Sequence, residues 1–133
     1  MLLVSLVACS NNAQTPPDPT RVIELGRDLF HSEGCVHCHG ENGQGLIGPR
    51  LNNGSVLDTF SSCADQARWI EEGSAGWLRD FGSSYGDTNK PVKGGMPGFG
   101  KRLDPEQLRA VASFTRVVFG GADPDRVIAD CYR

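Results

Sequence analysis

Two thiols and two imidazoles stand together in the segment Cys35-Val36-His37-Cys38-His39. In a helical turn, side chains three positions apart lie on the same face, so both thiols can bond to one edge of a planar group while the neighbouring imidazole reaches its centre. The chain has 133 residues and five cysteines, and an odd number requires at least one cysteine outside any internal disulfide. This segment constrains the fold most, because the rest of a short chain must be built around whatever it holds.

The spacing C-x-x-C-H is that of covalent c-type haem attachment, in which Cys35 and Cys38 form thioethers and His39 binds the iron. Three alternatives compete with it. A zinc site would need two more ligands, and no second closely spaced pair is present. A thioredoxin-like motif would need a βαβ setting, and the third alternative is a plain disulfide between the two cysteines. The spacing favours one covalent haem c over all three.

Helices account for most of the hydrophobic pattern, and no strand-like alternation of useful length is present. The Asp18-Pro19 pair favours a helix start, and the periodicity predicts that this helix continues to about Phe30. Gly26 lies in its middle, which suggests that another helix crosses closely there.

The clearest helix follows Asp104, which forms a capping-box pattern with Gln107. It is expected to run to Gly120 as a regular helix with Val118 on its buried face. Two weaker helices are expected, one at residues 62–72 ended by Gly73 and a short one after Asp123-Pro124.

A glycine-rich loop is predicted at residues 73–100, which contain eight glycines. A loop of that length in a small domain is usually functional or disordered. Met1 would be lost with a signal segment, so Met96 is the one methionine left, and the glycines around it allow the backbone to approach a haem face. We expect Met96 to be the second axial ligand, opposite His39. Buried carboxylates need donors, and the candidate donors to the haem propionates are Arg50, Trp77 and Tyr85.

The chain resembles a class I c-type cytochrome over residues 19–120. Gly26 and Phe30 match the positions of the family's first helix that cross its last helix, where Val111 and Phe114 would be their counterparts. The resemblance implies an all-α cytochrome c fold, with three main helices and glycine-rich loops wrapped around one covalent haem.

Residues 48–51 (Gly-Pro-Arg-Leu) resemble the family segment whose proline carbonyl accepts a hydrogen bond from the proximal histidine. By this resemblance Pro49 orients His39, with Arg50 beside it. Ligation by histidine and methionine fills both axial sites, which implies a one-electron carrier of a respiratory or photosynthetic chain and not an enzyme. It would act as a tethered shuttle or as the haem subunit of a membrane oxidoreductase complex. The alternative is a haem enzyme or sensor in which Met96 is displaced.

Residues 6–9 (Leu-Val-Ala-Cys) resemble the lipobox of bacterial lipoproteins, in which the cysteine becomes the lipid-modified first residue. We therefore expect a signal segment at residues 1–8, a flexible tether anchored through Cys9 at residues 9–18, a cytochrome domain at residues 19–121 and a tail at residues 122–133. An ordinary cleaved signal with a coincidental cysteine is the alternative, and both export the chain. The protein would sit on the periplasmic side or outer face of a membrane. There, Cys63 and Cys131 would pair and pin the tail.

The formal net charge is −3, which argues against nucleic acid as the partner. No run of about 20 apolar residues is present to span a membrane. Within this acidic chain, residues 88–103 carry four cations and no acid. They would attract an acidic redox partner, although such a run can also be no more than a solvated surface. The four cations are Lys90, Lys93, Lys101 and Arg102.

Overall fold

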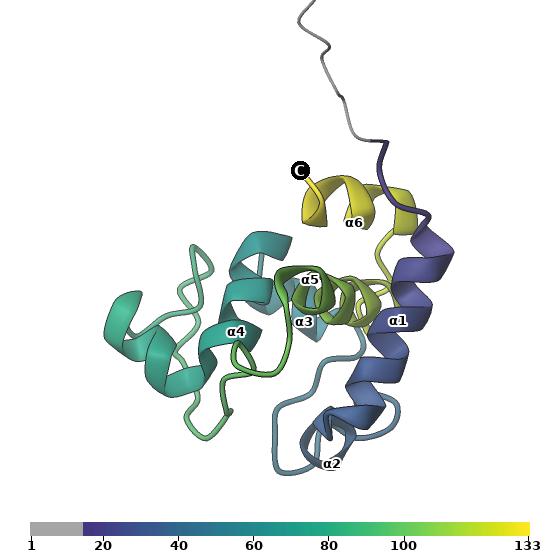
Figure 1. Cartoon of the computed structure of the whole chain (residues 1–133). Coiled ribbons are helices and arrows are strands. Elements are labelled where there is room, and N and C mark those ends of the chain that lie inside the picture. The colour runs from purple at the N-terminus through teal and green to yellow at the C-terminus, as the bar shows by residue number, and fades with distance from the viewer. Residues whose placement is uncertain (1–14) are drawn as a thin grey trace, which may run out of the picture.

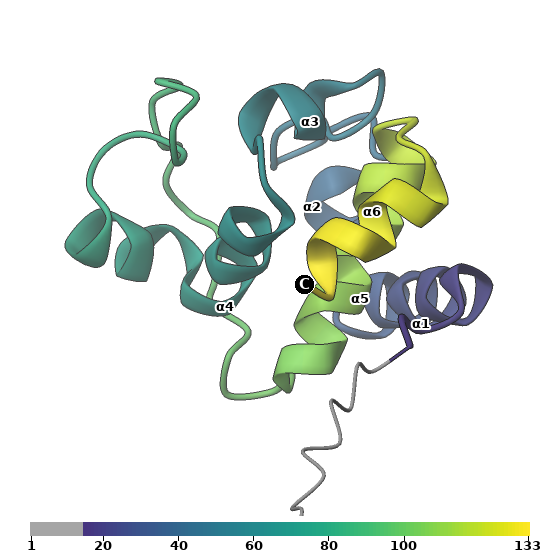
Figure 2. The ribbon, with the colours of Figure 1, turned by 90° about the horizontal axis from the view of Figure 1, so that it is seen from above.

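The structure is a computed structural model and describes residues 15–133. This part of the chain is helical, and its one β feature is an isolated bridge between Ser84 and Pro91. None of its helices is both long and apolar enough to cross a membrane. Figures 1 and 2 show how the helices are arranged. The elements are α1 (Pro19–Ser32), α2 (Cys35–His39), α3 (Ser55–Thr59), α4 (Cys63–Asp80), α5 (Pro105–Phe114), a π-helical turn η1 (Thr115–Phe119) and α6 (Pro124–Cys131).

The first and last long helices begin where the sequence predicts, because their capping residues act locally. The Asp18 carboxylate accepts a hydrogen bond from the Thr20 amide at 2.9 Å. At the start of α5, the Asp104 carboxylate accepts from the Gln107 amide at 2.9 Å, and the Gln107 side chain accepts from the Asp104 amide at 3.0 Å. This reciprocal pair is the predicted capping box. The short helix predicted after Asp123 is also confirmed, as α6.

The crossing of α1 and α5 organises the core (Figure 1). It depends on Gly26, because a Cβ there would overlap the carbonyl oxygen of Ala110 and lie 2.6 Å from Cβ of Phe114. Phe30 packs one turn further along, with its ring 5.5 Å from that of Phe114 and 5.3 Å from that of Phe119. The predicted close crossing at Gly26 is therefore confirmed.

Gly73 ends the first segment of α4, as the sequence predicts, but a second helical segment that was not predicted follows it. It has φ 67° and ψ 179°, a conformation that favours glycine, and it kinks α4 before the chain continues as helix to Asp80. The next residue, Ser74, is held by the distant Met96 carbonyl, which accepts from the Ser74 amide at 2.9 Å. The long predicted loop is therefore shorter by one helical segment, because a tertiary contact restarts the helix.

The end of the last helix also differs from the prediction. After Phe114 the chain forms η1, in which the Gly120 amide donates to the Thr115 carbonyl five residues earlier, at 2.9 Å. A π-turn contains an extra residue compared with an α-turn, so the buried face shifts. Val118, expected in the core, is 44% exposed, whereas Arg116 is only 7% exposed.

A disulfide joins Cys63 at the start of α4 to Cys131 at the end of α6. The disulfide adds a covalent link to the packing of α6 against α5 and α4. Figure 2 shows α6 beside α5, with its C-terminal end toward α4. The predicted signal segment (residues 1–8) and most of the predicted tether (residues 9–14) lie outside the described residues.

Candidate haem-binding site

Helix α2 brings the C-x-x-C-H residues into a single turn. Gly34 precedes it with φ 77° and Gly40 follows it with φ 82°. Cys35 and Cys38 are half-buried and unpaired. Two thiols on one turn, both available for bonding, match the requirement for two thioethers on one porphyrin edge.

The imidazole of His39 is buried and fixed by one hydrogen bond. Its Nδ1 lies 2.9 Å from the Pro49 carbonyl oxygen, and the residue is 8% exposed. A Cβ at Gly48 would lie 3.1 Å from Cε1 of this ring, so the glycine lets the loop close onto the histidine. Since Nδ1 donates to a carbonyl, Nε2 is the nitrogen that can bind a metal.

Burial sets the ionisation of both kinds of ligand in this turn. Loss of solvation lowers the pKa of His39, and the bond to Pro49 opposes this effect only in part. The neutral imidazole that metal binding requires is therefore the favoured form. Burial also raises the pKa of the Cys35 thiol to about 11, with the nearby Glu33 carboxylate adding to the rise. The thiol therefore stays protonated and is protected from oxidation, which proceeds through the thiolate.

Met96 comes from a different part of the fold, the loop that packs against α4. The Ser74 hydroxyl contacts the Met96 carbonyl oxygen at 3.2 Å and accepts from the Gly95 amide at 3.0 Å. The Met96 sulfur accepts a hydrogen bond from Nε1 of Trp69, 2.7 Å away. Backbone and sulfur are thus both held by α4.

An aromatic cluster is built around Trp69, the residue that contacts the Met96 sulfur. Trp69 packs edge-on against Tyr85 with ring centroids 4.8 Å apart and against Trp77 at 5.9 Å. Phe60 completes the group, with its ring 5.3 Å from that of Tyr85. Such a cluster is well packed and apolar, and it fixes the position of Trp69, which holds the Met96 sulfur.

The three candidate propionate donors differ in what they offer. The Trp77 indole N–H already donates to the Ser84 carbonyl oxygen at 2.9 Å. The Tyr85 hydroxyl accepts from the Lys93 amide at 2.8 Å, which leaves its own proton available. Arg50 is exposed. Trp77 is therefore the weakest of the three candidates, since its only donor is already used.

These residues fit a covalent haem c. Two unpaired thiols share one turn, the adjacent imidazole keeps one nitrogen for a metal, and a thioether sulfur is fixed on a second segment. In addition, Leu46 and Ile47, on the loop that follows the motif, expose 64% and 89% of their surface, although large aliphatic side chains usually gain from burial. A planar apolar group bonded to α2 would provide such cover.

Comparison with known proteins agrees with this geometry. The family model described as cytochrome c matches residues 23–117. The chain belongs to the cytochrome c family. No curated protein and no solved structure matches it significantly.

Membership of the cytochrome c family has direct consequences. This cytochrome has an all-α fold and one covalent haem c, and it is an electron-transfer protein of a family whose domains are typically extracytoplasmic. Sequence reasoning missed two features: the contact that Trp69 makes at the site and the burial of Arg116 in the core. The sequence placed Trp69 within the helix predicted at residues 62–72, but no pattern identified Met96 as its partner. The burial of Arg116 had no signal in the sequence, because an arginine normally stays at the surface.

Proposed function

We propose that this cytochrome is a one-electron carrier whose iron is bound by His39 and Met96, and that it is tethered to a membrane through lipid on Cys9. Haem iron supplies one-electron chemistry by alternating between the ferric and ferrous states. His39 and Met96 would hold the iron and keep water and other ligands from it.

The fastening of Met96 is the observation that carries this proposal. Its sulfur, its carbonyl and the amide before it are all engaged by Trp69 and Ser74 on α4. A ligand held at three points costs little entropy to bind and little reorganisation when the iron changes charge. That property favours electron transfer over an enzyme or sensor, which needs a sixth position that opens.

Optical spectroscopy of the haem-loaded protein tests the ligand assignment. Wild-type protein should give a reduced c-type spectrum and, when oxidised, the weak near-infrared band of an iron–methionine bond. Met96→Ala should lose this band, and Val92→Ala, at a half-buried residue of the same loop, should keep it. Haem in the wild type without that band would refute His39/Met96 ligation and favour a ligand-binding haem protein.

The position of the chain's entry supports a tether that leaves the haem motif accessible. Residues 16–19 enter beside α6, where they line a hollow with Asp125 and Ile128. In Figure 1 this entry lies at the upper end of α1, and α2 lies at its lower end. A lipid on Cys9 would therefore hold the domain by the end opposite to the haem motif.

Detergent phase partitioning in a bacterial host tests the anchor. The wild type should enter the detergent phase, Cys9→Ala should remain in the aqueous phase, and the control Ser10→Ala should behave as wild type. An aqueous wild-type protein with its haem attached would rule out the anchor but leave the carrier proposal intact.

We also propose that the basic residues near the Met96 loop dock an acidic redox partner. Lys90, Lys93 and Lys101 are exposed. The fourth predicted cation, Arg102, already has partners within the protein. Its Nε lies 3.4 Å from the Glu33 carboxylate, and its guanidinium lies over the Phe99 ring. We therefore assign the attraction mainly to the three lysines.

Electron-transfer rates with the partner, measured against ionic strength, test this docking surface. Lys93→Glu should slow the second-order reaction and flatten its salt dependence, and Arg126→Glu on α6 should not. Equal effects of the two substitutions would show that only net charge matters. Co-purification at moderate salt then separates a shuttle, which washes free, from a fixed subunit of an oxidoreductase complex.

A further inference from the structure

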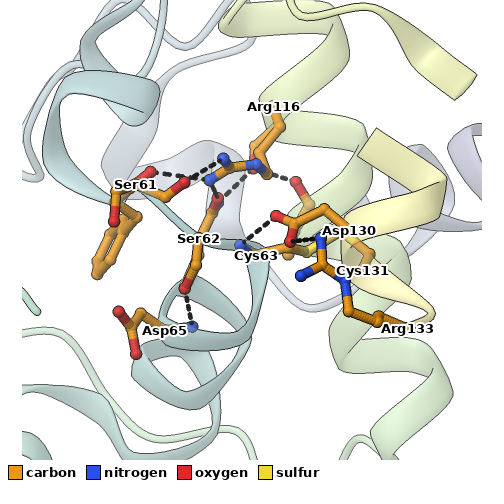
Figure 3. The surroundings of a disulfide bond; sticks show 12 residues. Ser61, Ser62, Cys63, Asp65, Arg116, Asp130, Cys131 and Arg133 are labelled. Atoms are coloured by element: carbon orange, nitrogen blue, oxygen red, sulfur yellow. Dashed lines mark hydrogen bonds and ion pairs between the residues drawn. A yellow bond between two sulfur atoms is a disulfide. The ribbon is translucent and has the colours of Figure 1, made fainter. Parts of the chain in front are cut away.

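Arg116 is a charged side chain inside the core of this cytochrome. It leaves η1 and reaches the start of α4, where its guanidinium donates to the carbonyl oxygen of Phe60 at 3.0 Å, to the side-chain oxygen of Gln66 at 3.2 Å and to the carbonyl oxygen of Ser61 at 3.4 Å (Figure 3). Its Nε has no hydrogen-bond partner. All three acceptors are neutral.

No carboxylate lies within ion-pair distance of Arg116 in residues 15–133. Burial lowers its pKa, and the negative charge of Asp130 opposes this effect from a distance. The Asp130 carboxylate itself accepts from the Cys63 amide at 2.8 Å (Figure 3). An arginine keeps its proton in proteins, so the core contains a positive charge that is solvated by dipoles and has no counter-ion in contact.

The contacts of Arg116 lead toward the predicted methionine ligand. It holds the backbone of Phe60, whose ring packs 6.1 Å from that of Trp69. Trp69 in turn donates to the Met96 sulfur. Gln66, bound by Arg116, also donates to Thr115 at 2.6 Å, so the junction before α4 is fastened to η1 at several points.

We propose that Arg116 is an internal cation that raises the reduction potential of the haem. Reduction adds one electron to the iron and removes one positive charge from it, with no bond formed or broken. A nearby fixed positive charge therefore favours the ferrous state. This inference rests on the proposed carrier function and makes Arg116 a positioning residue that sets the driving force of electron transfer.

The size of the effect can be worked out for a charge that lies one domain radius from the haem iron. A domain of about 100 residues has a radius of gyration of about 13 Å. At that separation, with an effective dielectric constant of about 20, a unit charge changes the ratio of reduced to oxidised haem on the order of fivefold to tenfold. An exposed charge acts mainly through water, where salt screens it beyond about 10 Å at 0.1 M.

Potentiometric titration of the holoprotein tests this role, with an electrode and mediators supplying the electrons. Arg116→Gln should lower the reduction potential by a shift equivalent to that fivefold to tenfold ratio. Arg116→Lys keeps the charge, so its potential should stay close to that of the wild type. The control Arg109→Gln removes the same charge from an exposed position of α5 and should leave the potential nearly unchanged. The shift for Arg116→Gln should persist at high salt.

A second variant covers the case in which Arg116→Gln does not fold. Gln66→Glu places a negative charge on the group that Arg116 already contacts, and it should lower the potential with Arg116 still in place. The inference would be overturned if the folded variant, with its near-infrared band retained, changed the reduction potential no more than Arg109→Gln does. A wild type that lacks that band or a reversible one-electron wave would instead refute the proposed function.

Discussion

Replacing Gly26 by alanine measures how much of the fold depends on the crossing of α1 and α5. In an exposed helix this change would stabilise by about 1 kcal/mol. Here the added Cβ would overlap the Ala110 carbonyl oxygen and lie 2.6 Å from Cβ of Phe114. Neither atom belongs to a flexible side-chain end, so the helices must separate. Overpacking costs about 1–3 kcal/mol, and a site that cannot relax lies at or above the upper end of that range.

The expected net effect of Gly26→Ala is a loss of about 2 kcal/mol in the free energy of unfolding. For a domain of this size that corresponds to a fall in Tm of roughly 6–12 °C. Thermal and denaturant unfolding of the holoprotein, followed by circular dichroism, would measure it. Gly94→Ala is the matched control, since a Cβ there meets no atom within 4 Å. A Gly26→Ala protein as stable as wild type would refute the argument that backbone contact fixes this crossing.

Three further outcomes are expected. Replacing Cys63 and Cys131 together by alanine should cost about 4 kcal/mol in the chain-entropy model, given a sequence separation of 68 residues. Denaturant titration without reductant measures this loss, and a free energy of unfolding equal to that of the wild type would show that the bond contributes nothing. In the protein without haem, Cys35 should react with iodoacetamide at pH 8 about a hundredfold more slowly than an unfolded control, because a pKa of about 11 in place of 9.0 lowers the thiolate fraction; equal rates would contradict its burial. Trp69→Phe should let added imidazole displace Met96 about fivefold more readily, as expected for a lost hydrogen bond of about 1 kcal/mol, and an unchanged imidazole affinity would show that the bond does not hold the ligand.

The sequence predicted the features that depend on neighbours along the chain. The two thiols and the imidazole of residues 35–39 must be close along the chain to bond one haem, so their spacing predicts the attachment site without a structure. Asp18 and Asp104 cap helices through amides two and three residues away, which is equally local. The close crossing at Gly26 could be predicted because a glycine inside a helix costs stability unless something approaches it.

Only the tertiary structure decided the features that depend on contacts between distant segments. The Met96 carbonyl restarts the helix after Gly73, and Trp69 finds the Met96 sulfur across the fold, although no local pattern specifies either pairing. The π-turn of η1 rotates Arg116 inward and Val118 outward. The periodicity of an ideal helix would place Val118 in the core and Arg116 at the surface. Arg116 can be buried because carbonyl groups of the segment before α4 accept hydrogen bonds from its guanidinium. The sequence thus predicts the haem attachment site, because that site depends on neighbouring residues. The surroundings that would set the properties of the haem depend on contacts between distant segments, which form only when the chain folds.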